Sequence, residues 1–231
     1  MKGKTFGKRL FQAVEPYLYL FPAFLLLIMF AYYPFAKNTV MSFFTVNKFR
    51  EIREFAGITN YLKVLGDEKF IQSIGNTLVF VAFTVPISIV IGFALALLVR
   101  KRTKTSSIYE AMYSMSMAIS VSVVAMIFQL AFNPSMGIVN KLFGTNVSWL
   151  TDPKTALGAI IFIQIWANVG YNFIFLLSGL RGMSEDVLES ARIDGATGIH
   201  LLTKIIIPMV SPTLLFLLMK DIAYAMTTSS F

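Results

Sequence analysis

LVFVAFTVPISIVIGFALALLV, residues 78–99, is a run of apolar side chains broken only by two hydroxyl residues, a glycine and Pro86. About 20 such residues in a helix cross the hydrocarbon core of a bilayer, so this stretch predicts a transmembrane helix. A proline inside such a helix can kink it without ending it, because neighbouring groups satisfy the freed carbonyl. The connection that follows, residues 100–104, reads RKRTK. A cluster of basic residues is typical of the cytoplasmic end of a span.

Four further apolar stretches on either side of this one are also long enough to cross a bilayer. They cover residues 17–36, 108–132, 156–180 and 205–226, and the stretch 108–132 is the weakest because it is rich in Ser and Met. The first apolar run is too long for a cleaved signal peptide, which indicates an uncleaved anchor. The sequence therefore predicts an all-α polytopic membrane protein with five transmembrane helices.

The overall composition agrees with a protein that resides in the bilayer. Hydrophobic residues make up 56% of the chain and charged residues 14%, whereas a soluble domain carries about 25% charged residues. The net charge of +8 is then explained by basic loops beside anionic lipid headgroups, and we expect no nucleic-acid partner. The chain has no cysteine and one histidine, so we expect no disulfide, no metal site and no bound cofactor.

Basic residues also predict the orientation and the domain limits. The residues before the first span and those of the second connection are basic and lie on the same side if all five segments cross. That side is expected to be the cytoplasm, which places the N-terminus inside. The predicted parts are a cytoplasmic arm at 1–16, a transmembrane domain at 17–226 and a short C-terminal end at 227–231. Residues 181–204 then form a cytoplasmic loop.

This loop is predicted to hold a short amphipathic helix. Ser184 is a candidate N-cap, and the acids that follow it suit the positive end of the helix dipole. Val187, Leu188 and Ala191 form a short apolar stripe at helical spacing. Gly195 stands where a helix ends in a left-handed residue, and Thr197 can start a second helix. A short amphipathic helix held below a membrane indicates a docking element.

The same loop closely resembles the signature of permease subunits in binding-protein-dependent ABC importers. That pattern is Glu-Ala-Ala, three residues, Gly, nine residues, then Ile-x-Leu-Pro. Here it is Glu189-Ser190-Ala191, then Gly195, then residues 205–208, which read IIIP. Ser for Ala and Ile for Leu are the two departures. Gly75-Asn76-Thr77 and the outer loop at 133–153 resemble the carbohydrate branch of that family.

The resemblance implies a fold and a set of partners. The family core normally has six helices, so a chain that ends at Phe231 implies that the C-terminal helix is missing, either because the gene product is truncated or because these residues are a fragment. Implied partners are a second homologous permease, a dimer of ATP-binding cassette ATPases and an extracytoplasmic solute-binding protein, in a bacterial or archaeal cell membrane. The implied solute is a sugar, an oligosaccharide or a polyol phosphate, passed inward by alternating access.

The chain itself is not expected to be an enzyme. It holds no Gly-x-x-x-x-Gly-Lys-Ser/Thr loop that could cradle phosphates, so ATP and Mg²⁺ are expected on the partner ATPase. In the family the loop helix sits in a groove of that ATPase, and the resemblance makes Glu189 an ion-pairing anchor; the alternative is a solvated helix charge. The implied docking residues are Glu185, Val187, Leu188, Glu189, Ala191, Asp194 and Gly195.

Two further groups of polar residues lie inside predicted spans. Gln164, Asn168 and Asn172 follow at i, i+4 and i+8 and so share one helix face. They either line the substrate path or join packed helices. Lys220 could attract a phosphate or carboxylate of the solute, with Tyr224 and Thr227 on its face. Alternatively, Lys220 reaches to the interface or pairs with Asp221.

Two rival functions remain open at this stage. One is a secondary transporter driven by an ion gradient, which needs no docking helix and usually shows inverted repeats or ionisable pairs at the midplane. The other is a truncated, non-transporting remnant of a permease. Dependence of uptake on an ATPase separates the importer from both.

Overall fold

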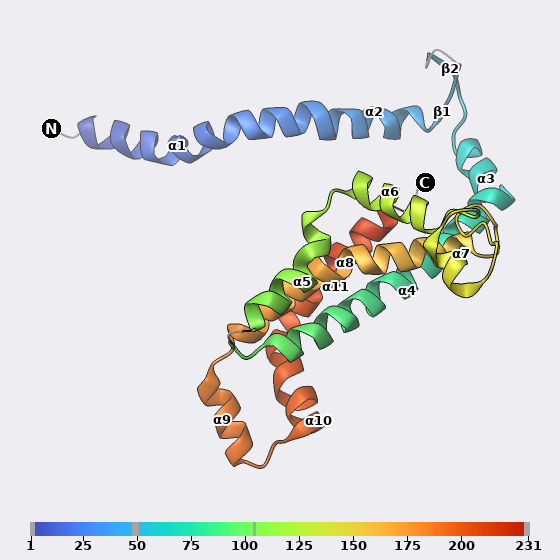
Figure 1. The fold of residues 1–231 in the computed structure, drawn as a ribbon. Helices are drawn as coiled ribbons and strands as arrows, with labels where there is room; N and C mark the ends of the chain where they lie inside the picture. Colours follow the sequence, from blue (N-terminus) through green and yellow to red (C-terminus); the bar gives the residue numbers. More distant parts are fainter. Residues whose placement is uncertain (1–2, 48–50, 104, 229–231) are drawn as a thin grey trace. The chain divides into compact units, whose positions relative to one another are not determined.

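A computed structural model describes residues 3–47, 51–103 and 105–228, with the side chains of residues 3–13 left out of account (Figure 1). Residues 1–2 of the predicted arm, Lys104 of the basic connection and residues 229–231 of the predicted C-terminal end lie outside this description. The chain divides into two compact units, Met1–Gln72 and Ser73–Phe231. Each unit is described by itself.

The first unit is built on one long helical segment. Helix α1 (Gly3–Leu27), the π-helical turn η1 (Ile28–Tyr32) and α2 (Tyr33–Met41) follow without a break. The wide π turn lies just before Pro34, where the proline lacks an N–H and its ring would crowd the preceding turn of an ordinary helix. The candidate span of this unit is Val14–Met41.

A small hairpin and a short helix complete the first unit. Strands β1 (Phe44–Val46) and β2 (Ile52–Phe55) pair antiparallel, with Phe44 opposite Phe55. The two rings lie 5.3 Å apart edge to face, a favourable aromatic geometry. Helix α3 (Thr59–Leu65) follows, and the boundary between the units falls inside the first turns of α4 (Glu68–Val99).

The regular secondary structure among the described residues of the second unit is all helical. After α4 its elements are α5 (Ser106–Ala118), α6 (Val121–Ala131), α7 (Ile138–Phe143), α8 (Ala156–Arg181), α9 (Glu185–Ile193), α10 (Gly198–Leu201), the π turn η2 (Leu202–Ile206) and α11 (Ile207–Thr228). Together with the first unit, the described residues hold four helices able to cross a membrane, or five if a bent pair counts as one span. The all-α polytopic class predicted from the sequence is confirmed.

The stretch 108–132 is the place where the fold departs from the prediction of one uninterrupted helix. It forms α5 and α6, which meet at 94°. Ile119 and Ser120 both have extended backbone at this corner, and the Ser120 hydroxyl accepts a hydrogen bond from the backbone N–H of Val123 at 3.4 Å. A serine at an N-cap stabilises a new helix start, which is why the chain breaks here.

The core of the second unit lies where α4, α8 and α11 run alongside one another (Figure 1). Phe173 and Leu176 of α8 are fully buried against Ala96 of α4 and Leu217 of α11. Gly92 of α4 allows a close approach, because a Cβ at this position would lie only 2.9 Å from the Cβ of Asn172 in α8. The close approach of α4 and α8 sets the spacing of the polar groups between them.

Candidate functional site

The loop after α8 forms a helical hairpin beyond the ends of the long helices of its unit (Figure 1). Its first arm is α9, and Ser184 occupies the N-cap position with extended backbone. The Ser184 side chain makes no capping hydrogen bond, so the predicted cap is wrong in its side-chain part. Glu185 and Asp186 lie in the first turn as predicted, where negative charge suits the helix dipole.

Two apolar residues anchor α9 to the bundle. Leu188 and Ala191 are 2% and 8% exposed, and Leu188 belongs to the same core cluster as Leu180 and Ile206. Val187, predicted in the same stripe, is 44% exposed. It lies on the edge of the buried face, since each residue turns a helix by about 100°. Leu188 and Ala191 therefore hold α9 in place and leave outward contacts to its exposed residues.

Gly195 ends α9 in the left-handed conformation that the sequence predicted, with φ at +87°. The N–H of Ala196 donates to the carbonyl of Ala191 at 2.8 Å, and the N–H of Gly195 donates to the carbonyl of Arg192 at 3.0 Å. These two bonds form a Schellman motif, which turns the chain sharply at a helix end. The turn leads directly to Thr197, which precedes α10 as predicted.

Replacing Gly195 with alanine is expected to loosen α9. An L side chain in the left-handed region costs about 1 kcal/mol, so amide hydrogen exchange in α9 should speed up about fivefold if the loop opens locally. Gly182→Ala is the matched control, because Gly182 has an ordinary φ of −78°. Equal exchange rates in the two variants would contradict the role given to the Gly195 turn.

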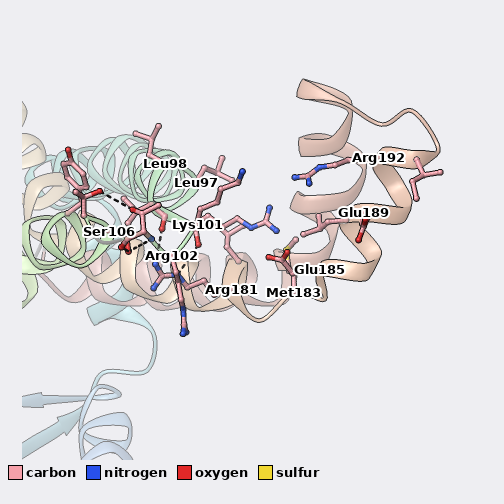
Figure 2. A pocket seen from close by; sticks show the side chains of 18 residues that line it. Leu97, Leu98, Lys101, Arg102, Ser106, Arg181, Met183, Glu185, Glu189 and Arg192 are labelled. Atoms are coloured by element: carbon pink, nitrogen blue, oxygen red, sulfur yellow. Dashed lines mark hydrogen bonds between the residues drawn. The ribbon is translucent and has the colours of Figure 1, made fainter.

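Two hollows flank α9. A cavity of about 1200 Å³ separates it from the connection after α4 (Figure 2), and Glu185, Leu188 and Glu189 lie on this side. A smaller pocket of about 590 Å³ on its other side is lined by Val187, Ala191, Asp194 and Gly195. The predicted docking residues thus occupy two faces of α9. The exposed Glu189 makes no ion pair with any residue that the structure describes.

Arg181, at the end of α8, fixes the base of the hairpin. Its Nη2 lies 2.6 Å from Oε1 of Glu110 in α5 and donates to the carbonyl of Val99 at 3.1 Å. Its Nε donates to the carbonyl of Arg100 at 3.3 Å. This residue joins the ends of three helices and was not among the predicted site residues. A basic residue in the last turn of a helix, near unsatisfied carbonyls, was the available signal.

The three amides of α8 are all buried but do not act as one row. Gln164 donates from Nε2 to Oδ1 of Asn168 at 3.1 Å. Asn172 donates from Nδ2 to Oδ2 of Asp221 at 2.8 Å and to Oγ of Ser88 at 3.2 Å. At Asn172 the structure therefore favours the helix-joining interpretation. Nδ2 of Asn168 is buried without a hydrogen-bond partner among the described residues, so this amide still has a donor to offer.

Lys220 pairs with its neighbour, one of the two alternatives left open. Its Nζ lies 2.6 Å from Oδ1 of Asp221 and 3.8 Å above the ring centre of Tyr171. Asp221 is fully buried, whereas the Lys220 side chain is 26% exposed. An ionisable pair inside an apolar span is costly and marks a functional position by default. The sequence signal for it was the adjacent Lys-Asp dipeptide in the fifth span.

The other two candidates on this face are exposed. Tyr224 is 39% exposed, and the Thr227 hydroxyl donates to backbone carbonyls of its own helix, those of Ala223 and Tyr224. The structure brings Lys220 to the amide of Asn172 through Asp221. The part of Tyr224 and Thr227 in a substrate path stays a prediction.

Comparison with known proteins shows which family the chain resembles. Residues 88–231 match the family described as binding-protein-dependent transport system inner membrane component. The sn-glycerol-3-phosphate transport system permease protein UgpA of Agrobacterium fabrum is 30% identical over 215 residues, 92% of this chain and 73% of that protein. The probable ABC transporter permease protein YurN of Bacillus subtilis is 28% identical over 203 residues, 84% of this chain and 69% of that protein.

Two solved structures share the fold. One is a bacterial ABC transporter involved in the import of the acidic polysaccharide alginate, with a TM-score of 0.79 and 24% identity over 95% of this chain and 77% of that one. The other is a bacterial alginate ABC transporter in complex with alginate pentasaccharide-bound periplasmic protein. Its TM-score is 0.76 at 25% identity, over 92% of this chain and 74% of that one.

Proposed function

The chain belongs to the family of binding-protein-dependent transport system inner membrane components, and from this premise we propose how it couples to an ATPase and which solutes it passes. It is a multi-pass membrane protein and the permease subunit of an ATP-driven importer, not a catalytic subunit. The proposal assigns α9 to the ATPase contact and the polar groups of α8 and α11 to the solute path.

In this proposal α9 is a docking helix that sits in a groove of a partner ATPase dimer, and the dimer binds ATP and Mg²⁺. The proposal rests on one observation: one side of α9 is buried against the bundle and the other side is exposed. Leu188 is buried against the core at the ends of α8 and α11, while Glu189 is exposed and has no ion-pair partner among the described residues. A helix held this way moves as one body with the bundle.

The same assignment fixes the topology. In this proposal α9 faces the cytoplasm. The number of spans and the basic residues near them then place the N-terminus on the same side. A second, homologous permease completes the membrane-spanning part of the proposed assembly. A solute-binding protein delivers solute on the opposite face of a bacterial or archaeal membrane.

Transport then proceeds by alternating access. ATP closes the ATPase pair and draws α9 inward, and the anchor at Leu188 and the clamp at Arg181 pass the displacement to α8, α4 and α5. The bundle opens outward to receive solute and opens inward after hydrolysis. Such a movement is a rigid-body rocking of packed helices about the membrane midplane.

The solute class that fits best is an anionic sugar derivative, either a polyol phosphate or an acidic oligosaccharide. Two of the similar proteins are a permease of an sn-glycerol-3-phosphate transport system and a transporter involved in import of the acidic polysaccharide alginate. Lys220 supplies a partly exposed cation whose charge is balanced by Asp221 until an anion competes for it. Gln164 and the free donor of Asn168 can bond hydroxyl groups.

Replacing Glu189 with glutamine tests the docking assignment. The change removes one charge-assisted contact, so we expect uptake to fall about tenfold and less ATPase to co-purify with the permease. Asp186→Asn is the matched control, since it also neutralises an exposed acid of α9, on the side of the smaller pocket. Equal losses in the two variants would argue against Glu189 as the anchor. Uptake that persists without an ATPase and follows a proton or sodium gradient would identify a secondary transporter instead.

A further inference from the structure

The large cavity beside α9 has a second property that ATPase docking does not use, an excess of positive charge. Its five cationic side chains come from the connection after α4, the end of α8 and the last turn of α9; they are Arg100, Lys101, Arg102, Arg181 and Arg192. Two acidic side chains, Glu185 and Glu189, line the same space. Five cations against two acids leave a net charge of +3 among the lining residues, or +2 when Glu110, the ion-pair partner of Arg181, is counted.

Four of the five cations have no ion-pair partner among the described residues. Arg181 is bound to Glu110 at 2.6 Å, but Arg100, Lys101, Arg102 and Arg192 form no ion pair with any residue in the described part of the chain. Figure 2 shows Arg192 and Glu185 reaching from α9 towards the ends of α4 and α8. Like charges around one concave surface concentrate the field there and attract an anion.

Part of the cavity wall is apolar, and some of its apolar residues are exposed. Leu180 and Leu188 close its inner side, while Leu98 is 77% exposed and Tyr109 is 47% exposed. Leu98 lies in the last turn of α4, whose candidate span ends at Val99. The cations directly after this end therefore stand at the level of lipid headgroups, and the exposed apolar residues stand at the level where acyl chains begin.

We propose that this cavity binds the headgroup of an anionic phospholipid, with the phosphate among the cations and the start of an acyl chain against Leu98 and Tyr109. A free phosphate ion would be attracted by the same charges but would leave the apolar wall uncovered. One lipid bound here touches both the connection after α4 and α9. Lipid composition therefore sets how firmly α9 is held, and this last consequence rests on the proposed role of α9 in coupling.

The test uses the permease purified with its partners. After partial delipidation it is mixed with equal amounts of phosphatidylglycerol and phosphatidylcholine, and native mass spectrometry counts the lipids that remain bound. The variant is Lys101→Gln with Arg102→Gln, both exposed and without ion pairs among described residues. The control is Lys141→Gln with Lys154→Gln, which removes the same charge from two exposed positions outside the cavity.

We expect the unaltered protein and the control to retain phosphatidylglycerol over phosphatidylcholine and the cavity variant to lose at least tenfold of that preference. Equal preference in the variant and the control would overturn the proposal. Displacement of phosphatidylglycerol by millimolar inorganic phosphate would overturn it in favour of a site for soluble anions. Lipid retention is measured without transport. The lipid proposal can therefore be judged even if the docking test at Glu189 fails.

Discussion

Replacing Asp221 with leucine is expected to lower the free energy of unfolding by about 3 kcal/mol. The carboxylate is fully buried between α4, α8 and α11, where it accepts from Asn172 and pairs with Lys220. Its removal leaves a cation and an amide without their partner, and breaking a buried pair from one side costs about 3–5 kcal/mol. The lower end applies because Lys220 is 26% exposed and regains some solvation.

The test is a double-mutant cycle with Lys220→Met, in which denaturant unfolding in mixed micelles gives the unfolding free energy of each variant. Replacing both partners by apolar groups removes the charge imbalance, so the double variant is expected to be more stable than Asp221→Leu alone. If the two single changes simply add, Lys220 and Asp221 do not stabilise one another. Solute uptake by Lys220→Met reports separately on the proposed anion contact.

The second large effect is expected at Gly92. Valine at this position would force a Cβ to 2.9 Å from the Cβ of Asn172 and to 3.0 Å from the backbone nitrogen of Phe173. Backbone atoms of α8 cannot move aside as a flexible side chain would. Overpacking of this kind costs about 1–3 kcal/mol, and we expect the upper end, together with loss of the hydrogen bond between Ser88 and Asn172.

Gly75→Val is the control for Gly92→Val. Gly75 lies in the same helix, and a Cβ there would meet nothing within 4 Å. We expect its stability to stay within about 0.5 kcal/mol of the unaltered protein, as for most substitutions away from packed sites. Equal destabilisation by both changes would show that loss of glycine itself matters, not the contact of α4 with α8.

These two predictions concern the same place in the molecule. Gly92 brings α4 close to Asn172, and Asn172 in turn reaches Asp221 on α11. A polar group buried between transmembrane helices cannot bond water. It must hydrogen-bond to a partner on another helix, because an unsatisfied polar group destabilises the fold. In the proposed mechanism the bundle moves as one body, and this cluster holds its three helices together.

The sequence was informative where the physics is local. A run of apolar residues long enough to cross a bilayer shows in one dimension, which is why four of the five predicted spans match continuous helices. Gly195 could be predicted because only glycine adopts a positive φ cheaply at a helix end. The stripe pattern did not show which of its residues are buried, because a residue such as Val187 at the edge of a stripe is buried only if a neighbour covers it.

The break between α5 and α6 shows where local signals fall short. Hydropathy over 108–132 cannot distinguish one straight helix from two that meet at 94°. The cap at Ser120 became visible only with the backbone conformation at Ile119 and Ser120. Serine is common in transmembrane helices, so its presence alone did not mark a corner.

The sequence by itself determined the membrane class, the family and the position of the short helix α9, since span length and motif spacing are properties of consecutive residues. Only the tertiary structure decided which polar groups meet. Asn172 bonds residues 84 and 49 positions away, Ser88 and Asp221, and the cavity beside α9 gathers cations from three separate segments. Hydrogen bonds and charges act over a few ångströms in space, and distance along the chain does not reveal which of them come that close.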